Sequence, residues 1–330
     1  MSSDVTRAVT EALGVALAPG EDSAIAAFPT RSAEAYRAFL RGRQQTGNDP
    51  ATLRGSNQEY EQAVALDSTF AEAWGSLSSG STILYLNGNR DPAVARRAHE
   101  AMERVVALRP GSVLARRARA SYLEIVAGDE PAARAELDLA LRENPNDATL
   151  LGASGVQDVN VGDLGSGLTK LERARELDPR APNVLGNLVS TYTYLHRPAD
   201  AQKAGATLLA IRPLDLIQIQ GVTIAFLAAG DLEGARRVLR DAVQRGVPAP
   251  RLAAHMTGYF ETGFALEEAE QQLVLRLTPS TFDDDRAWWA QALATLYWQR
   301  GDSAMARAYA DSALGPTRAT NAQLGVRIPS

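Results

Sequence analysis

The sequence contains no cysteine, and only Lys170 and Lys203 are lysines among its 34 basic residues. The absence of cysteine excludes a disulfide framework, a zinc–thiolate site and a cysteine nucleophile, and it leaves the redox compartment open. An excess of positive charge is missing as well, because the formal net charge is −5. No global field therefore draws the chain to nucleic acid or to anionic lipid, and neither is expected as a partner.

Long apolar runs are also missing. The longest uncharged stretch, residues 216–230, contains two glutamines and is shorter than the ~20 residues that a membrane-spanning helix needs. Near the N-terminus, Asp4, Arg7 and Glu11 interrupt the apolar run that a signal peptide requires. We therefore expect a water-soluble chain without membrane insertion.

Two ladders of turn residues run through the chain with a common period. Gly-Asp dipeptides begin at Gly128, Gly162, Gly230 and Gly301, at steps of 34, 68 and 71 residues. Prolines recur at Pro110, Pro145, Pro179 and Pro213, at steps of 35, 34 and 34 residues. Self-similarity at a fixed period predicts a repeat architecture with one supersecondary unit per period.

Residues 148–180 show what one unit contains. Apolar and small residues at helical spacing predict one helix over 148–161 and a second over 164–177. Gly162 can adopt the left-handed conformation that ends a helix, and Asp163 can cap the next one. Pro179 then stands where the second helix cannot continue. Each unit is therefore predicted to be a pair of antiparallel helices.

Several units carry a recognisable pattern. The segment 71–77, Ala-Glu-Ala-Trp-Gly-Ser-Leu, resembles the start of a tetratricopeptide repeat, and small residues such as Ala133 and Ala140 match its helix-crossing positions. The resemblance implies an all-α, right-handed α-solenoid of about eight helix pairs over residues 31–316. Residues 1–30 are then an N-terminal helical linker or cap, and 317–330 a tail. Residues 250–279 match poorly and predict an irregular seventh pair, while insertions predict lengthened turns near residues 46–53 and 84–91.

The N-terminal segment is similar to something more particular. An amphipathic helix predicted over residues 5–17, followed by Pro19-Gly20, resembles the segment that opens the tetratricopeptide region of large bacterial signalling proteins. In that class a kinase, cyclase or winged-helix DNA-binding domain precedes the repeats. The resemblance implies that the chain is the C-terminal region of a longer, in some cases membrane-tethered, sensor.

Four motifs invite a chemical interpretation, and each has a structural alternative that we favour. Residues 162–169 resemble a phosphate-binding loop but carry Leu168 where its lysine must stand. His99, His196 and His255 fall in separate repeats, as surface or turn histidines rather than metal ligands. The acidic residues 283–285 have capping-box spacing to Ser280 and Thr281.

Seven arginines between residues 96 and 119 could receive an acidic segment or a phosphate, although solvated faces with i, i+4 partners such as Glu100 and Arg104 account for them. We expect no enzyme, no cofactor and no metal site.

In the tetratricopeptide family the first helix of each pair lines a concave groove. Carried over by repeat position, this resemblance implies a peptide-binding groove formed by Val156, Asn160, Asn183, Ser190, Tyr194, Gln220, Ile224, Leu227, Gln291 and Trp298. Because these residues are uncharged, we expect an apolar or amphipathic segment as the ligand. It would come from another protein or from another domain of the same polypeptide. The alternative is a structural array that self-associates.

Overall fold

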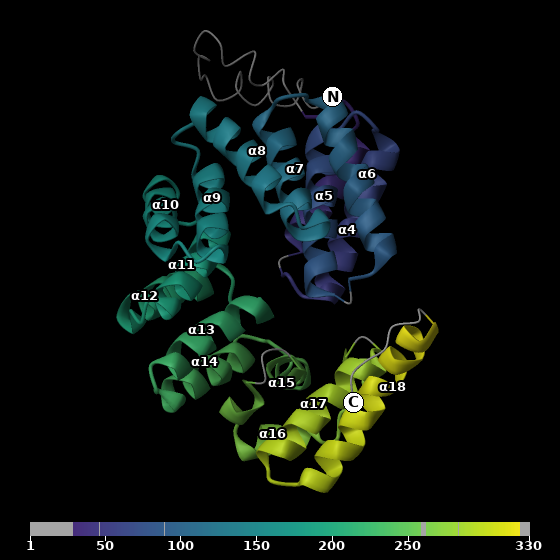
Figure 1. Ribbon diagram of the computed structural model, residues 1–330, viewed down its shortest axis with the longest axis vertical. Helices are drawn as coiled ribbons and strands as arrows, with labels where there is room; N and C mark the ends of the chain where they lie inside the picture. The colour runs from purple at the N-terminus through teal and green to yellow at the C-terminus, as the bar shows by residue number, and fades with distance from the viewer. Residues whose placement is uncertain (1–28, 46, 89, 259–261, 283, 324–330) are drawn as a thin grey trace, which may run out of the picture. The chain divides into compact units, whose positions relative to one another are not determined.

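The computed structural model describes residues 29–45, 47–88, 90–258, 262–282 and 284–323, and the side chains up to residue 313. Every regular element in these ranges is helical, with sixteen α-helices, α3 to α18 (Figure 1). The prediction of an all-α solenoid of about eight helix pairs is confirmed. The chain divides into two compact units, Met1–Leu150 and Leu151–Ser330. The predicted helix at residues 5–17 and the end of the predicted tail lie outside the described residues, and the array boundaries at 31 and 316 stay predictions.

Unit 1 contains three helix pairs. They are α3 (Ala33–Gln44) with α4 (Pro50–Leu66), α5 (Ala71–Asn87) with α6 (Pro92–Leu108), and α7 (Val113–Tyr122), continued by the π-helix η1 (Leu123–Ala127), with α8 (Glu130–Glu143). The predicted lengthened turns are wrong in part, because residues 50–53 and 84–87 are helical. Asp49 caps α4 by accepting a hydrogen bond from the Thr52 amide at 3.1 Å, and Pro50 has the φ that a first helical residue needs. The extra residues therefore lengthen the helices.

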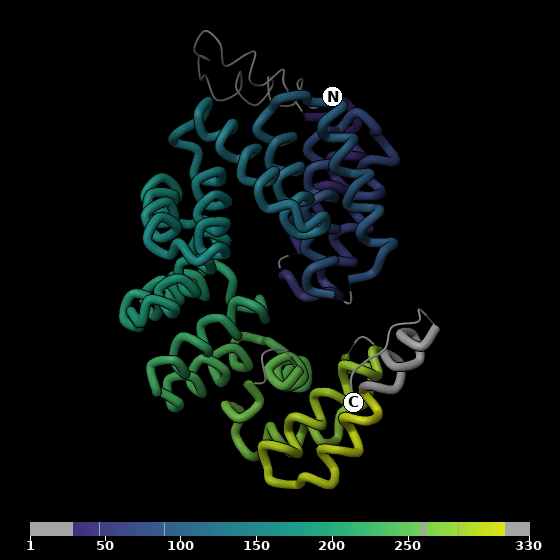
Figure 2. Tube along the Cα trace, in the orientation of Figure 1, coloured from purple at the N-terminus to yellow at the C-terminus, as the bar shows by residue number. Residues whose placement is uncertain are grey.

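Unit 2 holds the remaining pairs (Figures 1 and 2). The regular ones are α9 (Ala148–Asn160), whose first residues close unit 1, with α10 (Leu164–Leu177), then α11 (Pro182–Tyr194) with α12 (Pro198–Ile211), and α13 (Leu216–Ala228) with α14 (Leu232–Gln244). Two further pairs follow: α15 (Ala249–Gly258) and α16 (Glu268–Val274), with the 3₁₀ turns η2 (Thr262–Ala265) and η3 (Pro279–Phe282), and α17 (Arg286–Gln299) with α18 (Ser303–Gln323). The helices predicted over 148–161 and 164–177 agree with α9 and α10 to within one residue.

The Gly-Asp dipeptides form the turns inside the pairs. Gly162 has φ +87° and Gly230 has φ +75°, in the left-handed region that glycine adopts at low cost. Asp163 accepts a hydrogen bond from the Ser166 amide at 3.1 Å and so caps α10. The segment that resembles a phosphate-binding loop is therefore one of the regular inter-helix turns.

Pair α15–α16 departs from the regular pattern. The two helices have 10 and 7 residues, against 13 or 14 in α9 to α14. The end of α17 holds α16 in place, because Arg300 contacts Glu268 through both guanidinium nitrogens at 2.8 Å. These contacts lower the pKa of the Glu268 carboxyl to about 2.

One prediction about this region is wrong. His255 is not a surface or turn residue: it is buried, and its Nε2 lies 3.1 Å from Oε1 of Gln220 on α13. The interpretation of the acidic cluster as a helix cap is confirmed, because Asp285 caps α17 through the amides of Ala287 and Trp288, each at 2.9 Å. Ser280 and Thr281 do not form this cap, since both lie in η3.

Small residues let the two helices of a pair cross closely. A Cβ atom on Gly167 of α10 would stand 2.6 Å from Val159 Cγ2 and 2.7 Å from the carbonyl oxygen of Gly155, both on α9. Real Cβ contacts are not that short, so a side chain here must push the helices apart. Gly165, two residues earlier on α10, has no heavy atom nearer than Asp163 Oδ1 at 3.9 Å.

This contrast predicts opposite effects of one substitution. Gly167→Ala should lower the free energy of unfolding by ~1–3 kcal/mol because it overpacks the crossing. Gly165→Ala should raise it by up to ~1 kcal/mol, because alanine restricts the unfolded chain and favours helix. Urea denaturation followed by circular dichroism measures both, and a Gly167→Ala variant as stable as Gly165→Ala would contradict the close crossing.

Tyr192 links three helices of unit 2. Its buried ring lies 4.7 Å from the Arg197 guanidinium at the start of α12, and its hydroxyl donates a 2.8 Å hydrogen bond to Glu172 of α10. Burial, together with this bond to a carboxylate, raises the pKa of Tyr192 from 10.0 to about 12. The folded chain therefore favours the neutral phenol.

A raised pKa in the folded state predicts a loss of stability in alkali. The contribution of Tyr192 is fully present below its unfolded pKa of 10.0, and it is lost as the pH rises towards about 12. The difference in unfolding free energy between the wild type and Tyr192→Phe should therefore become smaller as the pH rises from 10.0 to about 12. Absorbance at 295 nm should show one late-titrating tyrosine that is missing in the variant. A Tyr192 that titrates with the exposed tyrosines would refute the assignment.

A candidate protein-binding surface on the first helices

Charge is distributed unequally between the two helices of each pair in unit 2. The first helices α11 and α13 contain no charged residue, and α17 contains only Arg286, at its first position. The second helices are different, since α10 and α14 each carry five charged side chains. The first helices therefore present a surface with little charge, which we call the first-helix surface; its exposed charged residues are Arg251, near the start of α15, and Arg286.

Asp158 is the one charged residue of α9, and it does not reach this surface. Its side chain is buried at 2% exposure, 2.6 Å from Nζ of Lys170 on α10. Ser166 donates a second hydrogen bond to the same carboxylate at 2.7 Å, and Lys170 also donates to Ser154 at 2.9 Å. The charge is thus neutralised between α9 and α10.

Most of the predicted groove residues are accessible. Tyr194 at the end of α11 is 61% exposed, and Trp298 near the end of α17 is 71% exposed. The other residues at least partly exposed are Val156, Asn160, Asn183, Ser190, Ile224, Leu227 and Gln291. Exposure of two large aromatic side chains to water is unfavourable, and packing within the described unit does not explain it.

Gln220 is the exception and corrects the prediction. It is 2% exposed, and its side-chain carbonyl oxygen meets His255 of α15 at 3.1 Å. The residue therefore joins two first helices inside the core and does not line their surface. Its neighbour Gln218 does approach α11: Oε1 of Gln218 lies 2.6 Å from the Cβ position of Gly186, so only glycine leaves room for this amide.

The residues of this surface lie on neighbouring helices. α11 packs against α13, α13 against α15, and α15 against α17. α11 also lies against α9, because Val184 of α11 is 3.2 Å from the Cβ position of Gly152 on α9. The helices that carry the predicted residues are therefore adjacent members of one unit.

Two exposed apolar residues belong with this set although the sequence did not nominate them. Val161 directly follows α9 and is 54% exposed, and Phe264 in η2 is 49% exposed. Tyr194, Leu227, Trp298 and Val161 stand at or just beyond the C-terminal ends of their first helices, whereas Phe264 comes six residues after the end of α15. We call these five residues the terminal apolar row. Val161 is one place beyond the last repeat position considered. Phe264 lies in the irregular pair, where the repeat phase assigns no position.

The part of the chain that the structure describes contains no group of three or more His, Asp or Glu side chains that could hold a metal ion. The same residues contain no helix both long and apolar enough to cross a membrane.

Comparison with known proteins gives likeness in structure only. No family model and no curated protein matches the sequence. Among solved structures, yeast Tom70 is similar over 90% of this chain and 66% of its own, with 14% identity and a TM-score of 0.53. A thermophilic tetratricopeptide-repeat protein of Thermus thermophilus has 20% identity over 58% of this chain and 99% of its own, with a TM-score of 0.46.

A tetratricopeptide-repeat protein of Parabacteroides merdae is similar over 86% of this chain and all of its own, with 10% identity and a TM-score of 0.44. At such identities the likeness concerns the fold alone. The 34-residue period and the helix pairs, together with the likeness to Tom70, show that the fold is an α-solenoid of helix pairs.

Proposed function

We propose that this chain is a protein-binding scaffold whose first-helix surface in unit 2 accepts an apolar or amphipathic segment, helical or extended, of a partner. The observation that carries the proposal is the distribution of charge: α11 and α13 have none, whereas the second helices α10 and α14 each carry five charged side chains. The partner is another protein or another domain of the same polypeptide.

The terminal apolar row supplies the anchors for such a segment. Binding energy in interfaces is concentrated in a few aromatic and large side chains that become fully desolvated. Tyr194 and Trp298 are of this kind, since each combines a large apolar ring with a polar group at the rim. Between them, half-buried Ile224 and Leu227 offer a shallower apolar contact. This is the composition on which the apolar face of a helix can lie.

The low charge of the first-helix surface also predicts how binding responds to salt. Complementary charge accelerates association and makes it sensitive to salt, and these first helices have almost no charge to contribute. Affinity should therefore change little with ionic strength.

Two substitutions test the proposal. Tyr194→Glu and Ile224→Glu should each reduce partner capture by about tenfold or more, because a carboxylate must then be desolvated on binding. Leu232→Glu is the matched control, since Leu232 is a partly exposed apolar residue on the second helix α14 and should have no effect. Quantitative pull-down, with folding checked by circular dichroism, provides the measurement. Capture that is unchanged in both surface variants, or lost at high salt, would overturn the proposal.

Self-association is the rival explanation for the same exposed residues. Trp298 and the partly exposed Met305 belong to the last pair, where a second copy could pack. Light scattering separates the two: a mass that stays monomeric over a wide concentration range argues against self-association. A mass that rises with concentration and falls in Trp298→Glu would replace the proposal by a structural array.

A further inference from the structure

Most arginines between residues 96 and 119 are neutralised by neighbouring repeats or by their own helix. Arg97 lies 2.9 Å from Glu61 of α4 and 3.3 Å from Glu100 of its own helix, so Glu100 pairs with Arg97 rather than with the expected Arg104. Arg104 donates to the Ser68 carbonyl at 3.3 Å, and its guanidinium lies 5.6 Å from the ring of Trp74. These side chains tie one repeat to the next.

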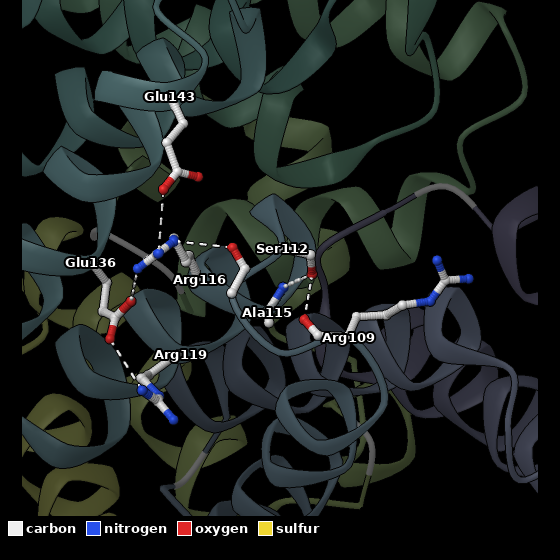
Figure 3. A network of polar contacts seen from close by, with 8 residues as sticks. Arg109, Ser112, Ala115, Arg116, Arg119, Glu136 and Glu143 are labelled. Carbon is white, nitrogen blue, oxygen red and sulfur yellow. Dashed lines mark hydrogen bonds and ion pairs between the residues drawn. The ribbon is translucent and has the colours of Figure 1, made fainter.

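Two arginines of α7 are bound to α8. Arg116 contacts Glu136 at 3.5 Å and Glu143 at 3.6 Å, and it donates to the Gly111 carbonyl at 3.2 Å (Figure 3). Arg119 reaches the other oxygen of Glu136 at 3.2 Å. The glutamates that α8 turns towards α7 are therefore already occupied.

Arg117, between these two, is different. Among the described residues its guanidinium makes no hydrogen bond and no ion pair, although the side chain is half-buried. It shares one side of α7 with Leu114, three residues earlier, which packs against Gly75 of α5. Arg117 is thus not one of the α7 arginines that contact Glu136 or Glu143 of α8.

Burial outweighs the one favourable charge near Arg117. It lowers the pKa of the guanidinium, and the attraction of the Asp147 carboxylate offsets this only in part. Asp147 also accepts hydrogen bonds at the start of α9, from the amides of Thr149 at 2.8 Å and Leu150 at 3.0 Å. A partly desolvated charge that is compensated only in part is unfavourable in the folded chain, and a carboxylate from a partner would complete the compensation.

We propose that Arg117 is a recognition residue that receives a carboxylate from an acidic segment of a partner protein. Its planar guanidinium can donate two parallel hydrogen bonds to a carboxylate, and partial burial strengthens such a bond. A polyanion such as nucleic acid is disfavoured because the chain has a net charge of −5. The position lies in unit 1 and is chemically distinct from the first-helix surface of unit 2, which has little charge, so the two proposals can fail separately.

A direct test uses a labelled peptide with glutamate at every third position in a glycine–serine background, and its glutamine counterpart. At low salt the chain should bind the glutamate peptide and not the glutamine one. Arg117→Gln should weaken binding by about tenfold or more. Arg117→Lys should weaken it by less, because lysine keeps the charge but cannot donate the two parallel hydrogen bonds of a guanidinium. Fluorescence anisotropy measures all of these affinities.

Arg96→Gln is the matched control, because Arg96 is an exposed arginine on the second helix α6. It should leave the affinity within about twofold, as expected for a screened surface charge. An equal loss in Arg96→Gln, or no binding of the glutamate peptide by the wild type, would overturn the proposal.

Thermal unfolding distinguishes recognition from a structural role. Arg117→Met should keep the melting temperature or raise it by roughly 2–4 °C, because it removes a charge that is compensated only in part and keeps the packing of the stem. A structural arginine would give the opposite sign, as Arg116→Met should, since that change leaves Glu136 and Glu143 without their partner. A lower melting temperature in Arg117→Met would therefore refute the recognition role.

Discussion

The close crossing of the two helices in each pair is the constraint on which the rest of this structure depends. The crossing positions hold alanine or glycine, and Ala133, Ala174, Ala201 and Ala235 are completely buried. Small residues bring the helix axes together but bury little apolar area per residue. A single pair therefore cannot supply a sufficient core, and larger side chains such as Leu171, Leu188 and Leu208 must pack between successive pairs. The solenoid follows, because each pair needs a neighbour on either side.

The parts of the fold that sequence alone could predict are those fixed locally. A Gly-Asp turn needs only a residue that tolerates positive φ and a side chain that caps the next helix, so Gly162 and Asp163 located the turn between α9 and α10 correctly. The wrong predictions concern residues whose surroundings are set by distant segments. His255 and Gln220 are 35 residues apart, and they meet because α13 packs against the shortened pair that follows. Nothing in the neighbouring sequence distinguishes a buried histidine there from an exposed one.

The same division applies to the candidate surfaces. That α11 and α13 lack charge is visible in the sequence, and the repeat phase correctly placed Tyr194 and Trp298 at exposed positions. The partners of each arginine were not visible in the sequence, because they lie on other helices: Arg97 and Glu61 are 36 residues apart, and Arg116 and Glu136 are 20 apart. Only the folded chain shows that Arg116 and Arg119 share the glutamates of α8 while Arg117 does not. Charge counting treats these three residues as equal, and geometry separates them.

The solenoid of helix pairs explains why two such different candidate surfaces can occur in one chain. The fold requires small side chains at the crossings and larger ones between pairs, and this requirement restricts only the buried sides of each helix. The outward positions of the first helices contribute little to the core, so they can carry arginine on α7 and tyrosine or tryptophan on α11 and α17 at modest cost to stability. Outward residues that are unfavourable in the free chain are informative, because the fold does not require them. The exposed Trp298 and the half-buried Arg117, whose charge Asp147 offsets only in part, are the residues on which the two proposals depend.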